Sequence, residues 1–321
     1  MPPMPHPYDV LVQSVTRIHH IIEKKNLEGR ISKGGFGEFL LAHALNHLLA
    51  NGWKGPDAFG IGTGKAYEYK ITLVDKINFN FGANQGNAEA LITEWADARR
   101  GGIFSANYSP ENKDFSRVIH TPAMSMKRRL VEDFERNNPR QLTASYSINR
   151  MATMEGSSEV RLTNRGENHP YDDLVDEIQL AYAEANRLGI ANRLAKGGVS
   201  EILLARELNH LCSTSAKGWD AKDIDQERFH EYKISETNQF NFDFGTRVDD
   251  IRALVERGYD GHEFCYVARR DGTEITTIME IPILALSETI IAHFAKTTGK
   301  RLNMNYNWER LEEIEGTRIV R

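Results

Sequence analysis

Three side chains near residue 60 have the types and spacing of a metal-dependent hydrolytic site. Asp57 lies eleven residues before Glu68, and Lys70 follows Glu68 by two. Side chains two positions apart on a β-strand point to the same face, so Glu68 and Lys70 would lie together on a strand over 66–72. A carboxylate from a neighbouring strand can reach that face. The spacing therefore predicts that two carboxylates and a lysine meet at one point.

Two converging carboxylates are the ligands that a hard cation prefers, Mg²⁺ above all, with Mn²⁺ able to substitute. Such a cation polarises a phosphoryl oxygen and lowers the pKa of the water it holds. A neighbouring lysine can orient that water and offset the charge that builds up on phosphorus. We therefore expect Asp57 and Glu68 to be metal ligands and Lys70 to be catalytic, in the hydrolysis of a phosphodiester.

The same residues occur twice in the chain. A shift of 163 residues places the first set on Asp220, Glu231 and Lys233. From residue 6 to 82, 31 of 77 aligned pairs are identical without a gap, which is far above coincidence and indicates a duplicated domain. Towards the end of each copy the offset becomes 160. We expect a first domain at 1–150, a linker at 151–168 and a second domain at 169–321.

Several alternatives compete with this interpretation. A single Asp-x₁₀-Glu-x-Lys pattern is also typical of an ion pair on a solvated strand, and its survival in both copies is what favours catalysis. Asp223 and Asp225 compete with Asp220 for the metal position, and Asp220 is preferred because it keeps the spacing. Near the start of the first helix of each copy, a further carboxylate could bind a second ion or hold the lysine, which adds two candidate catalytic residues, Glu38 and Glu201.

The elements that must position these residues follow from hydrophobic periodicity. In the first copy, helices are expected at 38–50, 87–99 and 125–137, with the first entered through Lys33, Gly34 and Gly35. Strands are expected at 58–61, 66–72, 77–81, 103–108 and 116–120. This order predicts an α/β domain in which helices flank a central mixed sheet.

Pro56-Asp57 followed by Glu68-Tyr69-Lys70, with a glutamate on the preceding helix, resembles the PD-(D/E)XK nuclease superfamily, which includes most type II restriction endonucleases. The order of helix, three strands, helix and strand is also similar to the core of that superfamily. The resemblance covers both copies, although the second has Trp219 in place of the proline. It implies the same ligand and lysine roles in each copy, and two restriction-endonuclease-like αβββαβ cores related by a pseudo-two-fold axis.

Polar residues alternate with apolar ones on further strands. Asn78 and Asn241 begin such runs directly after the metal strand, and amides can read adenine edges, although a strand with one face on the core explains the phenylalanines. The end of each copy repeats the pattern, as a face that reads bases or as an exposed edge strand. The candidate DNA-contacting residues of these ends are Ser145, Ser147, Asn303, Asn305 and Asn307. Asn46-His47 and Asn209-His210 either close a helix end or touch a phosphate.

Composition limits the class of protein. The net charge of −5 argues against a general polyanion binder, but basic residues lining one cleft would suffice for DNA. With two cysteines, Cys212 and Cys265, no disulfide framework is indicated, and no apolar stretch is long enough to span a membrane. The sequence favours a cytoplasmic protein.

Together these observations lead us to expect a Mg²⁺-dependent, site-specific endonuclease for double-stranded DNA. One chain would act as a monomeric pseudo-dimer in which each site cuts one strand. If the chain belongs to a restriction–modification system, a cognate DNA methyltransferase is a possible partner. The alternatives are a structure-specific or repair nuclease of the same superfamily, and a non-catalytic DNA-binding protein that retains the fold.

Overall fold

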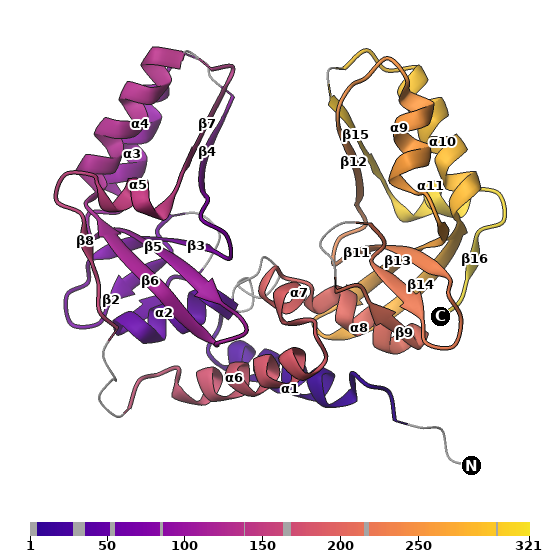
Figure 1. Ribbon diagram of the computed structural model, residues 1–321, viewed down its shortest axis with the longest axis horizontal. Coiled ribbons are helices and arrows are strands. Elements are labelled where there is room, and N and C mark those ends of the chain that lie inside the picture. The colour runs from indigo at the N-terminus through magenta and orange to yellow at the C-terminus, as the bar shows by residue number, and fades with distance from the viewer. Residues whose placement is uncertain are drawn as a thin grey trace. The chain divides into compact units, whose positions relative to one another are not determined.

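A computed structural model describes residues 5–27, 36–51, 55–83, 86–137, 139–162, 168–214, 218–299 and 301–321. Within these ranges the chain forms two mixed sheets with the same order of six strands, each accompanied by a two-stranded ribbon and by helices (Figure 1). The predicted α/β class is therefore confirmed, and the repeated strand order is compatible with the predicted duplication.

The first sheet has the order β1-β2-β3-β5-β6-β8. Strands β3 and β5 run parallel, and the other neighbouring pairs are antiparallel. The helix between β3 and β5 makes this parallel crossover. The strands are β1 (His47–Leu49), β2 (Ala58–Gly60), β3 (Ala66–Thr72), β5 (Gly102–Ser109), β6 (Asp114–Thr121) and β8 (Ser158–Glu159).

The second sheet repeats this topology as β9-β10-β11-β13-β14-β16, with β11 and β13 parallel. One extra residue near the start of β13, Glu263, produces a register shift opposite Phe229 and His230, which the first sheet lacks. The strands are β9 (His210–Cys212), β10 (Ala221–Asp223), β11 (Phe229–Ser235), β13 (His262–Asp271), β14 (Glu274–Pro282) and β16 (Arg318–Ile319).

Helices pack on these sheets through apolar stripes. In α4 (Ala123–Asn137), Met126, Leu130 and Phe134 recur at a spacing of four and are all buried. Its counterpart α10 (Ile283–Ala295) buries Leu286, Ile290 and others at the same spacing. The remaining helices are α1 (Asp9–Lys24), α2 (Phe36–Leu45), α3 (Ala88–Asp97), α5 (Ile148–Ala152), α6 (Asp172–Arg187), α7 (Ala191–Ala195), α8 (Val199–Leu208), α9 (Ile251–Gly258) and α11 (Trp308–Glu312).

Each ribbon joins strands that are far apart in sequence. β4 (Ile77–Ala83) pairs antiparallel with β7 (Gln141–Tyr146), and β12 (Phe240–Thr246) pairs with β15 (Arg301–Tyr306). Alternate side chains of all four strands enter the hydrophobic core that each ribbon shares with its helices. The other face of each ribbon is exposed and polar.

Helix α2, which follows α1 in the first copy, ends earlier than predicted. The expected helix at 38–50 ends at Leu45, because Asn46 adopts a left-handed conformation with φ of 57°. Asparagine tolerates this conformation better than most residues, and it terminates the helix. Asn209 does the same after α8, with φ of 58°. The apolar residues that follow belong to β1 and β9, so the prediction of helix there was wrong. The predicted entry through Lys33–Gly35 lies outside the described residues.

The chain folds into two compact units, and the boundaries of these units differ from those of the two sequence copies. The first unit contains residues 17–187 and 194–197, and the second contains 1–16, 188–193 and 198–321. In the second unit the hydroxyl of Tyr8 accepts a hydrogen bond from the backbone N–H of Cys212 at 2.8 Å. In the first unit Tyr171 accepts the equivalent bond from Leu49 at 2.9 Å. The start of each copy is thus built into the unit that holds the other copy's sheet.

This exchange changes the expected boundaries. The divisions at 1–150, 151–168 and 169–321 separate the copies in sequence, whereas residues 169–187 fold with the first sheet. Part of the expected linker is also ordered structure, because β8 pairs with β6 at the edge of that sheet and Val160 donates to Val118. The periodic pattern gave no sign of so short a strand.

Candidate active sites

In the first unit, β3 places Glu68 and Lys70 on one face, as predicted. The Nζ atom of Lys70 donates to Oε1 of Glu68 at 2.6 Å. Glu68 is buried, with 7 % of its surface exposed. Burying a carboxylate requires a partner, and the lysine two residues along the strand provides one.

Asp57 lies beside the same strand. It precedes β2, and its backbone N–H donates to the carbonyl of Tyr67 at 2.8 Å. Its carboxylate Oδ2 accepts from the backbone N–H of Tyr69, also at 2.8 Å. Tyr69 stands between Glu68 and Lys70 in the chain, so the three residues expected to converge are neighbours.

The second unit repeats this arrangement. Oδ2 of Asp220 accepts from the backbone N–H of Tyr232 at 3.0 Å, and the ammonium of Lys233 donates to Glu231. The competing carboxylate of Asp223 is directed elsewhere, towards His210 and His230. Asp220 is therefore the aspartate that lies beside Glu231 and Lys233.

Glu201 joins the second site through an arginine that the sequence interpretation missed. Nη1 of Arg193 pairs with Glu201 and lies 3.5 Å from Oδ1 of Asp220. Arg193 also donates to the carbonyl of Ser213 at 2.9 Å, which fixes its position. The repeat contained a signal for this residue, since Arg30 is its counterpart in the first copy, but Arg30 lies outside the described residues.

Burial and like charge act on the second site together. Burial first, and then the charge of Asp220, raises the pKa of Glu201 above its usual range, in spite of Arg193. Burial also raises the pKa of Glu231, against the opposing effect of Lys233. For Lys233, burial alone would lower the pKa, but Glu231 and other neighbours raise it overall. These carboxylates repel one another at close range, and a divalent cation would relieve that repulsion.

The two sites differ in what faces the second oxygen of the strand glutamate. In the first site, Oε2 of Glu68 pairs with Nε of Arg99, which also stacks on Trp95 with its guanidinium 5.1 Å from the ring centroid. In the second site, Nε2 of His262 lies 3.8 Å from Oε2 of Glu231. The position equivalent to Arg99 is Tyr259, since both carbonyls accept the backbone N–H three residues on.

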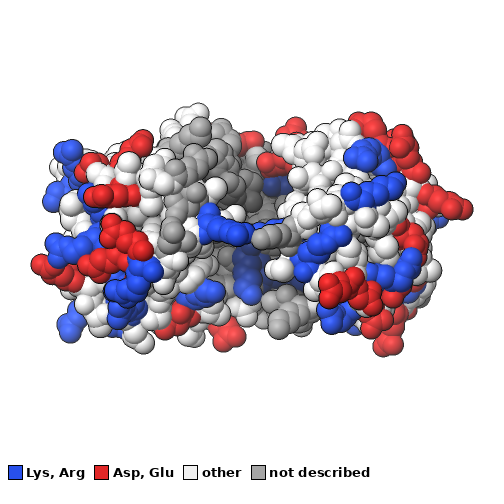
Figure 2. All heavy atoms as spheres, turned by 90° about the horizontal axis from the view of Figure 1, so that it is seen from above, with Lys and Arg blue, Asp and Glu red and all other residues white. Residues whose placement is uncertain are grey.

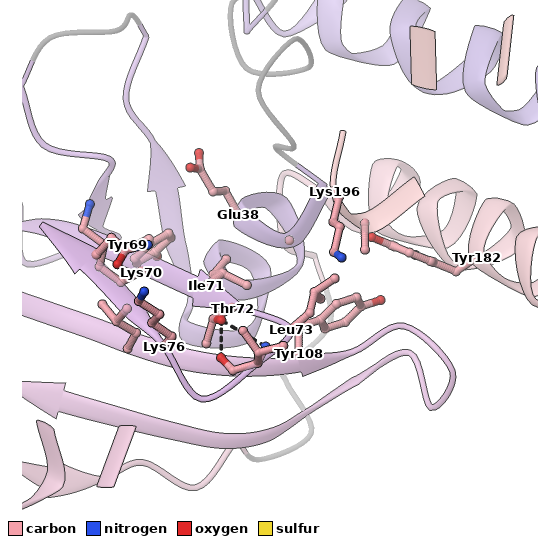
Figure 3. A pocket seen from close by; sticks show the side chains of 15 residues that line it. Glu38, Tyr69, Lys70, Ile71, Thr72, Leu73, Lys76, Tyr108, Tyr182 and Lys196 are labelled. Atoms are coloured by element: carbon pink, nitrogen blue, oxygen red, sulfur yellow. Dashed lines mark hydrogen bonds between the residues drawn. The ribbon is translucent and has the colours of Figure 1, made fainter. Parts of the chain in front are cut away.

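A pocket of about 550 Å³ opens beside the first site (Figure 3). Glu38 from the first turn of α2 and Lys70 from β3 line it, together with Lys76 and, just after α7, Lys196. Lys196 belongs to the second copy but to the first unit. The pocket combines a carboxylate with three ammonium groups, which suits a phosphate-bearing ligand held next to a cation.

The histidines that follow the helix-ending asparagines contact buried tyrosines. Nδ1 of His47 lies 2.7 Å from the hydroxyl of Tyr69, and His210 makes the same contact with Tyr232 at 2.8 Å. Both histidines are buried. Of the two interpretations offered for Asn46-His47 and Asn209-His210, the structural one describes these contacts.

The candidate DNA-contacting amides gather on the exposed faces of the ribbons. Asn78 is paired in register with Ser145, whose hydroxyl donates to Oδ1 of Asn78 at 2.6 Å. Asn241 donates to both Asn303 and Asn305 at 2.9 Å. These residues lie on strands that are far apart in the sequence, and the structure brings them together on two polar surfaces.

Ser147 and Asn307 do not belong to these surfaces in the way we expected. Each is the N-cap of a short helix, where its side-chain oxygen accepts the backbone N–H of Arg150 at 3.1 Å or Arg310 at 3.2 Å. An oxygen engaged in capping satisfies the helix end rather than a base edge. The strict alternation of the sequence extended the strand two residues too far.

Basic and acidic side chains are intermixed on the surface drawn in Figure 2, and neither sign forms a continuous face on a unit. Affinity for a polyanion would therefore depend on local groups such as the lysines of the pocket. No helix among the described residues combines the length and apolar character needed to cross a membrane.

Comparison of the chain with protein-family models and with curated proteins finds no match. What the two sites can do is therefore inferred from their geometry.

Proposed function

We propose that the chain is a Mg²⁺-dependent endonuclease for double-stranded DNA, a tandem pair of nuclease domains resembling the PD-(D/E)XK superfamily. One observation carries the proposal. In both copies an aspartate carboxylate accepts the backbone N–H of the middle residue of Glu-Tyr-Lys, at 2.8 and 3.0 Å, beside a paired glutamate and lysine. Chance ion pairs would not reproduce this set of bonds in two copies whose other residues mostly differ.

The donor set fits a hard divalent cation. Asp57 with Glu68, and Asp220 with Glu231, would hold Mg²⁺. Burial, and then the charge of Asp220, raises the pKa values of Glu201 and Glu231, so a bound cation would be favoured there. When bound, Mg²⁺ supplies the charge that polarises a phosphoryl oxygen and acidifies a water. Glu201 lies close enough to the second site to hold Arg193 in place.

The lysines would perform the remaining steps. The ammonium of Lys70 lies beside Glu68, where it can orient the attacking water and offset negative charge on phosphorus. Lys233 occupies the same position in the second site. Substrate binding would draw on Lys76 and Lys196 for backbone phosphates.

Recognition of a defined sequence is assigned to the ribbons. The major groove of DNA admits a two-stranded β-ribbon, and amides pair with adenine in a bidentate manner. The exposed amides of Asn78, Asn241, Asn303 and Asn305 are therefore the residues proposed to read bases. Because one ribbon has Ser145 where the other has Asn305, the recognition site would be only partly symmetric.

The experiment is to incubate the purified chain with plasmid and with random-sequence DNA, in Mg²⁺ or in a chelator, and to sequence the fragment ends. We expect cleavage that requires the metal, with ends that share one short sequence. Ends without a common sequence, or that cluster at branched or damaged DNA, would favour a structure-specific nuclease. Binding without cleavage would favour a non-catalytic DNA-binding protein. The Lys70→Ala/Lys233→Ala double variant controls for contaminating nucleases.

A further inference from the structure

The second unit holds a cluster of ligand-type side chains apart from the proposed catalytic site. Nε2 of His210 lies 3.0 Å, and Nε2 of His230 2.9 Å, from Oδ1 of Asp223. The three ligand atoms all lie within 4.8 Å of one another, and all three residues are buried. His230 and Glu231 are adjacent on β11, so their side chains point to opposite faces of the sheet. The cluster therefore lies on the face away from Lys233.

The surroundings of the cluster suit metal binding. Nδ1 of His210 is engaged by the hydroxyl of Tyr232 at 2.8 Å, which orients the ring and directs Nε2 towards Asp223. Nδ1 of His230 is buried and has no hydrogen-bond partner among the described residues.

Access to the cluster is open on one side. A pocket of about 290 Å³ is lined by His210 and Asp223, with Arg228, Tyr266 and Glu280 among its other walls. Arg228 donates to Oδ2 of Asp223 at 2.6 Å. The other oxygen, Oδ1, faces the two imidazoles. Its side chain is 41 % exposed, so it can move when a cation arrives. The pocket has room for a further ligand such as water.

The first copy lacks these groups. Counterparts of Asp223 and His230 are Gly60 and Tyr67, and only His47 is retained, stacked on Tyr67 with ring centroids 4.3 Å apart. The duplicated nuclease-like residues are thus common to both copies, whereas the His-Asp-His cluster belongs to one. Because only one copy has the cluster, the fold that the two copies share does not require it.

We propose that His210, Asp223 and His230 form a Zn²⁺ site with three protein ligands and one open position. Two imidazoles and a carboxylate are donors that suit zinc, while Mg²⁺ prefers oxygen alone. The ligands come from β9, β10 and β11, so a bound ion would link three neighbouring strands. Since β11 also carries Glu231 and Lys233, zinc would stabilise the strand on which the second catalytic site is built.

The test is zinc binding by the full chain after removal of metals, measured by titration calorimetry and by the mid-point of thermal unfolding. We expect one tight equivalent of Zn²⁺ that raises this mid-point and is not displaced by excess Mg²⁺. Asp223→Gly and His230→Tyr install the residues of the first copy, and each should weaken that equivalent by about 100-fold or more. His47→Gln is the matched control and should leave it unchanged.

Histidine ¹⁵N spectra of the wild-type chain test zinc binding by these residues even if a variant fails to fold. Added Zn²⁺ should shift the Nε2 resonances of His210 and His230 and leave that of His47 in place. The proposal is overturned if those two resonances do not move, or if zinc binds equally well after both substitutions. Glu68→Gln/Glu231→Gln should keep the tight equivalent, so failure of the proposed nuclease site would not affect this result.

Discussion

The Nζ atom of Lys70 lies 2.6 Å from Oε1 of Glu68, while the other oxygen of that carboxylate is paired with Arg99. A cation that binds Glu68 must therefore compete with two positive groups. In the second site, Glu231 pairs with Lys233, and Tyr259 replaces the arginine. The two sites should consequently differ in their affinity for Mg²⁺.

Arg99→Tyr should raise the apparent Mg²⁺ affinity of the first site. A charge-assisted hydrogen bond contributes about 1.5–3 kcal/mol, so the expected gain is about tenfold or more. The measurement is the rate of nicking against Mg²⁺ concentration in a Lys233→Ala background, where only the first site works. Arg100→Ala, which changes an exposed neighbour, is the control. Equal Mg²⁺ dependence in both variants would contradict the proposed competition.

Acidification should inactivate the second site at a pH above the ordinary pKa of glutamate. Burial raises the pKa of both Glu201 and Glu231, and a protonated carboxyl is a poor ligand for Mg²⁺. Nicking by Lys70→Ala should therefore be full above the raised pKa values and fall as the pH drops through them. Glu201→Gln should remove one of these titrations from the profile. Undiminished nicking down to pH 4.5, the usual value for glutamate, would be inconsistent with this environment.

The same shifts affect stability with a definite sign. A carboxyl whose pKa is raised by folding binds its proton more tightly in the folded chain than in the unfolded chain. In the absence of Mg²⁺, the contribution of Glu201 and Glu231 to the free energy of unfolding should thus increase as the pH falls towards 4.5. This contribution is measured by denaturant unfolding of wild type and Glu201→Gln at several pH values. A difference between them that does not vary with pH would rule out a raised pKa at Glu201.

Much of this architecture followed from the sequence. Residues two positions apart on a strand share a face, so the pairing of Glu68 with Lys70 could be predicted from their spacing. The repeat predicted the same pairing for Glu231 and Lys233. Arg99 and Arg193 could not be found in this way. Each reaches its carboxylate from a separate element, and no periodic pattern records which distant arginine will enter a site.

The exchange of chain starts between units was also beyond the sequence. The copies are equal in pattern, so Tyr8 could equally have packed on its own copy or on the other. The choice depends on the path of the connecting chain rather than on the residues that meet. The cap roles of Ser147 and Asn307 were missed for a different reason, since an N-cap residue has extended backbone and continues the alternation of the preceding strand.

The exchange can be tested through its two tyrosines. Tyr8→Phe and Tyr171→Phe each remove the acceptor of a buried backbone N–H, at Cys212 and Leu49 respectively. An unsatisfied buried donor costs about 1–3 kcal/mol. We expect each substitution to lower the free energy of unfolding by that amount in denaturant titrations, and the double variant to lose about the sum. Unchanged stability in both single variants would show that these bonds do not form.

The ribbons and the caps should respond differently to substitution. Asn78→Ala and Asn305→Ala each remove an exposed amide, so they should relax sequence preference at one position by about 1–3 kcal/mol. Ser147→Ala removes a cap instead and should lower the free energy of unfolding by about 1 kcal/mol. It should not alter the sequences at fragment ends. Cleavage-site sequencing compares the three variants. The assignment fails if the asparagine variants cut the same sites with unchanged preference.

The central claim is that each copy holds one phosphodiester-cleaving site, and strand-specific nicking tests it most directly. Supercoiled plasmid is incubated with Mg²⁺ and with wild type, Lys70→Ala, Lys233→Ala or the double variant, and the nicked strand is identified by sequencing. Loss of the lysine should slow its own site by about 10²–10³-fold. Wild type should linearise the plasmid, and each single variant should nick one strand, with opposite strands in the two cases. The double variant should leave the plasmid intact. Linear product from the double variant, or an intact plasmid with wild type in Mg²⁺ or Mn²⁺, would contradict the account.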